Sequence, residues 1–104
     1  MFVVTFFASW CTPCRPEFGP LNEVRQVFSE KDVTILAVNL FEDLFKKGMK
    51  RRMARFLDAT KPSFAVLRSA KDREIEKRFG GVDRIPTVYL FDHTGKPVFT
   101  FIHQ

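Results

Sequence analysis

The sequence predicts one α/β domain, residues 1–104, with a mixed four-stranded central sheet flanked by helices. Three observations favour this architecture. Residues 2–8 and 33–40 are β-branched and aromatic runs, which are typical of strands covered on both faces. The segment between them, 12–30, has apolar residues at helical spacing, so the three elements predict a right-handed parallel βαβ unit. A hairpin pattern closes the chain at 87–102.

The first helix is expected to run from about Thr12 to Glu30. Its apolar positions are Phe18, Leu21, Val24, Val27 and Phe28. Pro16 lies near the first turn, where proline is tolerated. Pro20 lies in the interior and is expected to bend the helix.

The second half of the chain predicts two more helices and the hairpin. A helix is expected at about 46–59, followed by a short extended piece at 64–67. A third helix is expected at 70–79, where two glycines end it. The strands 87–91 and 97–102 flank the turn sequence DHTG, in which glycine suits the turn.

Composition disfavours several classes of function. The net charge is +5, and the richest basic cluster, residues 46–55, is expected to be the solvated face of a helix. No aromatic platform accompanies this cluster, so nucleic acid is not an expected partner. No apolar run reaches the roughly 18–20 residues that span a bilayer, and the apolar N-terminus is interpreted as a strand, not a signal peptide. Two cysteines are too few for a disulfide scaffold, which favours chemistry over stapling.

Both cysteines lie in the stretch SWCTPCRPEF, between a predicted buried strand and a predicted helix. Unpaired N–H groups and a partial positive charge at a helix N-terminus stabilise a thiolate. Cys11 is therefore expected to have a lowered pKa and to be the attacking nucleophile. Cys14 is expected to be more buried and to resolve the mixed disulfide. Thr12 and Pro13 are uncharged, which favours a reducing to intermediate potential.

The stretches FFASWCTPCRPEF and GGVDRIPTVYLFDHTGKPV resemble the thioredoxin superfamily, and most closely its TlpA/ResA-type thiol:disulfide oxidoreductases. The resemblance extends from Phe2 to about Phe101. It implies a thioredoxin-like fold that lacks the usual N-terminal strand and C-terminal helix. The sheet order it implies is 33–40, 2–8, 87–91, 97–102. A missing helix would leave aromatic surface on 97–102 uncovered, where a partner or a second copy would bind an otherwise monomeric chain.

The resemblance also implies roles for residues beyond the cysteines. Pro86 would be a cis-proline facing the cysteine pair. The backbone of Ile85 would pair with a substrate strand. Trp10 would shelter the nucleophile, and it would form the substrate-binding surface together with Thr12 and Pro13.

Glu17 lies one helical turn after Cys14. TlpA/ResA-like proteins often carry a glutamate at this position, where it would shuttle the proton of the resolving thiol. The alternative is that the helix dipole simply favours an acidic residue near the N-terminus. Thr5 occupies the position of the buried aspartate of thioredoxins, and a threonine cannot act as a carboxylate base. This departure favours Glu17 or water as the proton carrier.

The expected function is dithiol–disulfide exchange, in which Cys11 attacks a protein disulfide and Cys14 resolves the intermediate. An upstream dithiol donor would supply the electrons. The exchange needs no metal or organic cofactor beyond the redox-active disulfide Cys11–Cys14. The alternative is a redox-inactive or weakly active binding module on the same fold. The resemblance favours an extracytoplasmic or periplasmic location, with a cytoplasmic location still open.

Two other uses of the cysteines are disfavoured. Zinc needs four ligands, and the remaining candidates, His93 and His103, do not have the usual zinc spacing. Peroxiredoxins carry a threonine three residues before the peroxidatic cysteine, and Ala8 occupies that position here.

Overall fold

The computed structural model describes residues 1–42, 47–68, 82 and 84–102. Its elements are β1 (Phe2–Phe7), the 3-10 turn η1 (Thr12–Cys14), α1 (Arg15–Val27), β2 (Thr34–Asn39), α2 (Met49–Thr60), β3 (Ala65–Arg68), β4 (Thr87–Phe91) and β5 (Pro97–Ile102). The helix expected at 70–79 lies outside the described residues. The other expected elements appear within a few residues of their predicted bounds.

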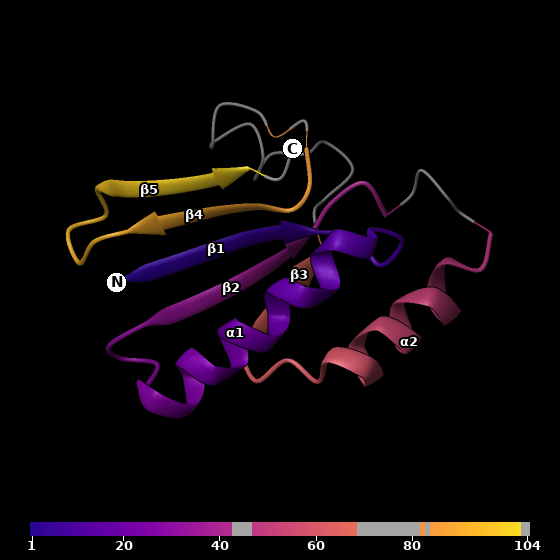
Figure 1. The fold of residues 1–104 in the computed structure, drawn as a ribbon, viewed down its shortest axis with the longest axis horizontal. Coiled ribbons are helices and arrows are strands. Elements are labelled where there is room, and N and C mark those ends of the chain that lie inside the picture. The colour runs from indigo at the N-terminus through magenta and orange to yellow at the C-terminus, as the bar shows by residue number, and fades with distance from the viewer. Residues whose placement is uncertain (43–46, 69–81, 83, 103–104) are drawn as a thin grey trace.

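The strands form one mixed sheet in the order β3-β2-β1-β4-β5 (Figure 1). β1 pairs with β2 in parallel and with β4 antiparallel, and β4 pairs antiparallel with β5. The four predicted strands therefore lie in the predicted order. β3 pairs in parallel with β2 and adds a fifth strand at the edge. The sequence indicated this strand only as a short extended piece.

The first helix differs from its prediction at both ends. Proline has no N–H group to donate, and the chain passes from Cys11 through the η1 turn, with Pro13 near its start, before α1 begins. α1 ends at Val27, because Phe28 has an extended backbone while its N–H still donates to the Val24 carbonyl at 2.9 Å. Pro20 lies inside α1, as expected.

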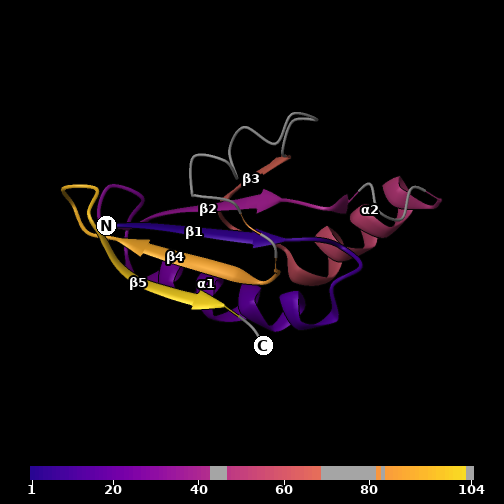
Figure 2. The ribbon, with the colours of Figure 1, turned by 90° about the horizontal axis from the view of Figure 1, so that it is seen from above.

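The core on one face of the sheet is built from aromatic rings. Phe7 of β1 contacts Phe18 of α1 and Phe56 of α2, with ring centroids 5.0 and 5.1 Å apart, and all three side chains are fully buried. Both described helices therefore cover this face (Figure 2). Burial of each such ring stabilises the fold by about 1.5–3 kcal/mol. On the opposite face, Phe6 and Val38 are the centre of a second buried cluster.

The β5 strand is exposed along its whole length. Its exposed apolar side chains are Val98, Phe99, Phe101 and Ile102, and Phe99 is 58% exposed. β5 is an edge strand, so its outer backbone groups also lack a strand partner within the described sheet. The exposed aromatic surface expected on 97–102 is present. No helix in the described ranges is both long and apolar enough to cross a bilayer.

Candidate active site

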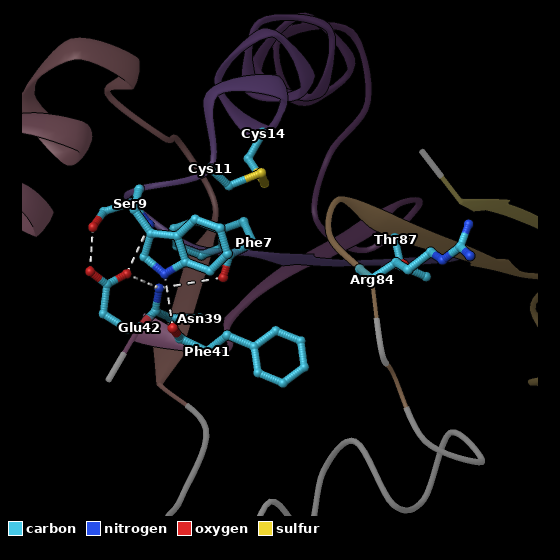
Figure 3. The surroundings of a disulfide bond; sticks show 10 residues. Phe7, Ser9, Cys11, Cys14, Asn39, Phe41, Glu42, Arg84 and Thr87 are labelled. Carbon is cyan, nitrogen blue, oxygen red and sulfur yellow. Dashed lines mark hydrogen bonds between the residues drawn. A yellow bond between two sulfur atoms is a disulfide. The ribbon is translucent and has the colours of Figure 1, made fainter. Parts of the chain in front are cut away.

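The cysteine pair lies where β1 ends and η1 begins, at the carboxyl end of a central strand (Figure 3). Open α/β sheets commonly place their sites at this end. Cys11 has an extended backbone, and its N–H donates to the Ala8 carbonyl at 3.1 Å. Cys11 and Cys14 form a disulfide, with Cα atoms 5.4 Å apart. Cys14 is fully buried and Cys11 is 4% exposed, so Cys14 is the more buried of the two.

The disulfide rests on the aromatic core described above. Cys11 and Cys14 belong to the same buried cluster as Phe7, Phe18 and Phe56. The Arg15 guanidinium lies 5.9 Å from the centroid of the Phe56 ring, a cation–π distance. The cysteines therefore pack on buried apolar side chains, and the exposed Arg15 places a positive charge at the start of α1.

Of the two residues expected to face the cysteines, Ile85 packs against the same cluster, from the segment before β4. The Ile85–Pro86 peptide bond is cis, and Pro86 is fully buried. The Thr87 hydroxyl donates to the Arg84 carbonyl at 2.6 Å, which closes the turn around Pro86.

Trp10 also packs against the cysteine cluster, and its indole N–H donates to the Phe41 carbonyl at 2.8 Å. Thr12 and Pro13 are exposed beside the disulfide. Trp10 is thus partly buried, whereas Thr12 and Pro13, between the cysteines, are exposed to solvent.

Glu17, the expected proton carrier, and Thr5, at the position of the thioredoxin aspartate, differ in their surroundings. Glu17 is half-buried in the first turn of α1. Thr5 is fully buried in β1, and its hydroxyl has no hydrogen-bond partner within the described part of the chain. Thr5 therefore has no carboxylate that could accept a proton, and its hydroxyl makes no hydrogen bond with the described residues.

A polar cluster beside the disulfide was not foreseen from the sequence. Its members are Ser9, Asn39, Glu42 and Arg52, which we call the Glu42 cluster. The Glu42 carboxylate is 4% exposed and accepts from the Ser9 N–H at 2.8 Å and from the Ser9 hydroxyl (Figure 3). It also accepts from the Asn39 amide at 2.9 Å and from the Arg52 guanidinium at 3.1 Å. The guanidinium donates a further hydrogen bond to the Ser9 hydroxyl at 2.9 Å.

The environment of Glu42 favours its ionised form. Burial raises the pKa of the Glu42 carboxyl, but hydrogen bonds from Ser9, Asn39 and Arg52 together outweigh burial and hold this pKa below its ordinary value of 4.5. One signal could have pointed to the cluster: Asn39 and Glu42 lie at the carboxyl end of a predicted strand that neighbours the cysteine strand. Arg52 gave no such signal, because it lies in a basic run assigned wholly to solvent.

Metal binding has little support in the described residues. Within 1–42, 47–68, 82 and 84–102, no group of three or more His, Cys, Asp or Glu side chains could hold an ion. His93 lies in the turn between β4 and β5, at the opposite end of β4 from Pro86.

The sequence profile of the Redoxin family matches the chain over residues 1–104. The chain belongs to the Redoxin family. It is 29% identical over 93 residues to the thiol-disulfide oxidoreductase ResA of Geobacillus thermodenitrificans, which covers 89% of this chain and 49% of ResA. It is 31% identical over 96 residues to ResA of Bacillus thuringiensis subsp. konkukian, covering 91% and 50% of the two chains. This Redoxin chain thus spans about half the length of the curated relatives it matches.

The fold of this Redoxin chain is also similar to solved structures. A thiol:disulfide interchange protein of the thioredoxin family from Chlorobium tepidum superimposes with a TM-score of 0.76. The two chains are 21% identical, and the match covers 98% of this chain and 68% of the other. The thioredoxin-like fold and the resemblance to TlpA/ResA-type proteins, both predicted from the sequence, are confirmed.

Proposed function

We propose that this chain is a thiol:disulfide oxidoreductase that reduces protein disulfides through Cys11 and Cys14. One observation carries the proposal: the two cysteines form a disulfide at the point where a central strand leads into a helical N-terminus. The names of the ResA relatives support the same reaction class.

The exchange begins with the reduced pair. The Cys11 thiolate attacks one sulfur of a substrate disulfide, forming a mixed disulfide and releasing the other substrate sulfur as a thiolate that takes up a proton. Cys14 then loses its proton and attacks the Cys11 sulfur. This step releases the second substrate thiol and leaves the Cys11–Cys14 disulfide. Two electrons pass to the substrate, and an upstream dithiol donor restores the reduced pair.

Cys11 is the better nucleophile on two counts. It precedes the first helical turn, so the N–H groups of that turn stabilise its thiolate. Cys11 is also slightly exposed, whereas Cys14 is fully buried with its sulfur bonded to Cys11. Burial of Cys14 suits a thiol that acts within the protein.

The substrate would lie across the surface made by Trp10, Thr12, Pro13, Ile85 and Pro86. Thr12 and Pro13 are exposed, so an incoming chain would meet them first. Ile85 lies on the far side of the cysteine cluster, where its backbone would pair with the substrate strand. Glu17, half-buried one turn beyond Cys14, would carry the proton that Cys14 releases.

Location and association belong to the same proposal. The likeness to ResA favours an extracytoplasmic setting, and the chain acts as a monomer towards its substrate. The exposed apolar side chains of β5 would accept a partner or a second copy.

Insulin reduction tests the proposed activity. The reduced chain, supplied with dithiothreitol, should accelerate the precipitation of reduced insulin chains. A Cys14→Ser variant should accumulate a mixed disulfide through Cys11, because the resolving thiol is missing. A Cys11→Ser variant should accumulate none.

A redox titration against glutathione tests the direction. A reducing to intermediate potential is expected, and a value near about −120 mV would contradict the reductase assignment. A reversible Cys11–Cys14 disulfide without turnover of insulin would instead favour a binding module.

A further inference from the structure

The Glu42 cluster lies beside the redox pair but takes no part in the exchange described above. We propose that Glu42 is a positioning residue for the thiol chemistry: through Ser9 it fixes the loop that carries Trp10 and Cys11. The inference rests on the proposed function, because it concerns the same cysteines. Its evidence is a set of contacts that hold this loop from outside.

The loop is attached at two consecutive residues. Ser9 donates twice to the Glu42 carboxylate, once from its N–H at 2.8 Å and once from its hydroxyl. Trp10 donates from its indole to the carbonyl of Phe41 at 2.8 Å. Ser9 and Trp10, the two residues that precede Cys11, thus donate to Glu42 and Phe41, two consecutive residues after β2. Phe41 accepts through its backbone carbonyl and Glu42 through its side chain. Such a double attachment restrains rotation as well as translation of the loop.

Glu42 is itself held in place. Asn39 donates to one of its oxygens at 2.9 Å, and the Arg52 guanidinium donates to the other at 3.1 Å. Arg52 also reaches the Ser9 hydroxyl, so β2, α2 and the cysteine loop meet at one carboxylate. Burying an ion pair costs desolvation that an apolar contact would avoid, but hydrogen bonds to both carboxylate oxygens of Glu42 favour one geometry, although the buried Asn39 Oδ1 has no partner among the described residues.

Glu42 does not act as a proton donor to the cysteines. Its carboxyl is ionised at neutral pH, because hydrogen bonds from the cluster outweigh the effect of burial and lower its pKa. Its carboxylate accepts hydrogen bonds from Ser9, Asn39 and Arg52. Its influence on Cys11 is therefore expected through the position of Ser9.

Two variants break the attachment in different ways. Glu42→Gln removes the charge and places an amide against donors. Ser9→Ala removes both hydrogen bonds of the Ser9 hydroxyl, the one it donates to Glu42 and the one it accepts from Arg52, and leaves the Glu42–Arg52 ion pair in place. The matched control is Asp92→Asn in the turn between β4 and β5. Asp92 likewise accepts from backbone N–H groups and a hydroxyl, but it lies at the other end of β4 from the redox site.

The two measurements report the position of the loop that carries Trp10 and Cys11, and not the stability of the fold. The first is the rate at which iodoacetamide alkylates Cys11 in the reduced chain, measured from pH 5 to 9, at temperatures well below unfolding. The second is the fluorescence of Trp10, the single tryptophan of the chain, in the oxidised and reduced states. Both Glu42→Gln and Ser9→Ala should change the alkylation rate in the same direction by about threefold to tenfold and shift Trp10 emission. The double variant should change the rate by less than the product of the single effects.

Three outcomes would overturn the inference. One is an unchanged pH profile and Trp10 emission in both variants, with only a lowered melting temperature, as expected for Asp92→Asn. Another is an effect of Glu42→Gln that Ser9→Ala does not share, which would indicate charge acting through space. The third is full multiplicativity in the double variant. If Glu42→Gln does not fold, Ser9→Ala alone decides. Failure of the wild-type chain to reduce insulin would contradict the proposed function, while alkylation and fluorescence would still test the positioning role.

Discussion

Phe56 of α2 stacks on Phe7 of β1, with ring planes 22° apart and centroids at 5.1 Å. Phe18 of α1 meets both rings at steep angles, 69° to Phe7 and 89° to Phe56. Since Cys11 and Cys14 belong to the same buried cluster, these three rings pack together with the disulfide. Aromatic pairs of this kind add about 0.5–1.5 kcal/mol each beyond the burial of their area.

Phe56→Ala should destabilise the chain by about 3–5 kcal/mol, because it leaves a cavity between two helices and the sheet. Urea denaturation followed by circular dichroism measures the loss. Phe99→Ala on the exposed β5 strand is the control and should change stability by no more than about 0.5 kcal/mol. Equal losses of unfolding free energy in the two variants would contradict the stabilising role given to the three buried rings.

Glu17→Gln should slow the second step of the exchange by about a hundredfold, because an amide cannot accept the proton of Cys14. Single-turnover reduction of a peptide disulfide measures this step as decay of the mixed disulfide. Glu23→Gln, an exposed substitution on the same helix, removes an equal charge and should leave the rate unchanged. Equal slowing by both substitutions would assign the effect to the charge of the helix and not to proton transfer.

Thr5→Val should raise stability by about 1 kcal/mol. The substitution keeps the shape of the side chain and removes a buried hydroxyl that has no hydrogen-bond partner among the described residues. Thr87→Val is the matched control: Thr87 is also buried, but its hydroxyl donates to the Arg84 carbonyl, so its loss should destabilise. Thermal unfolding distinguishes them, and a lower melting temperature for Thr5→Val would show that its hydroxyl is satisfied in solution.

Acid should weaken the fold in part through Glu42. The pKa of Glu42 is lowered in the folded protein below its ordinary value of 4.5, which applies to the unfolded chain. Its contribution to stability is therefore complete above about pH 4.5 and is lost as the pH falls through the lower, folded-state pKa. Urea midpoints measured from pH 7 to 3 should fall on acidification, and less steeply in Glu42→Gln. Parallel curves for the two proteins would contradict this linkage.

Much of the fold could be predicted because its signals are local. The runs at 2–8 and 33–40 and the hairpin ending at 102 have strand patterns that do not depend on distant residues. The short β3 strand was less predictable, because four residues carry little periodicity and its pairing with β2 is a tertiary event. The end of α1 at Val27 is of the same kind, since helix boundaries depend on capping geometry.

The site divides along the same line. Cys11 and Cys14 could be found because a two-residue spacing between a strand and a helix is itself the signal. Ser9 and Arg52 could not, because their contacts with Glu42 arise only when three segments of the chain come together in the fold. Arg52 illustrates the difficulty: within a basic run it is indistinguishable from exposed neighbours such as Arg51, until its guanidinium is seen on Glu42.

The contacts around Ser9 reach far along the chain, to Glu42 across 33 residues and to Arg52 across 43. During synthesis, Cys11 and Cys14 are added to the chain before Glu42 and Arg52. Until Arg52 has been made, the hydrogen bonds that Glu42 and Arg52 make with Ser9 cannot all form, so the loop before Cys11 lacks this restraint. If Glu42 positions the cysteine loop as proposed, selective thiol chemistry would be acquired only after α2 has been made.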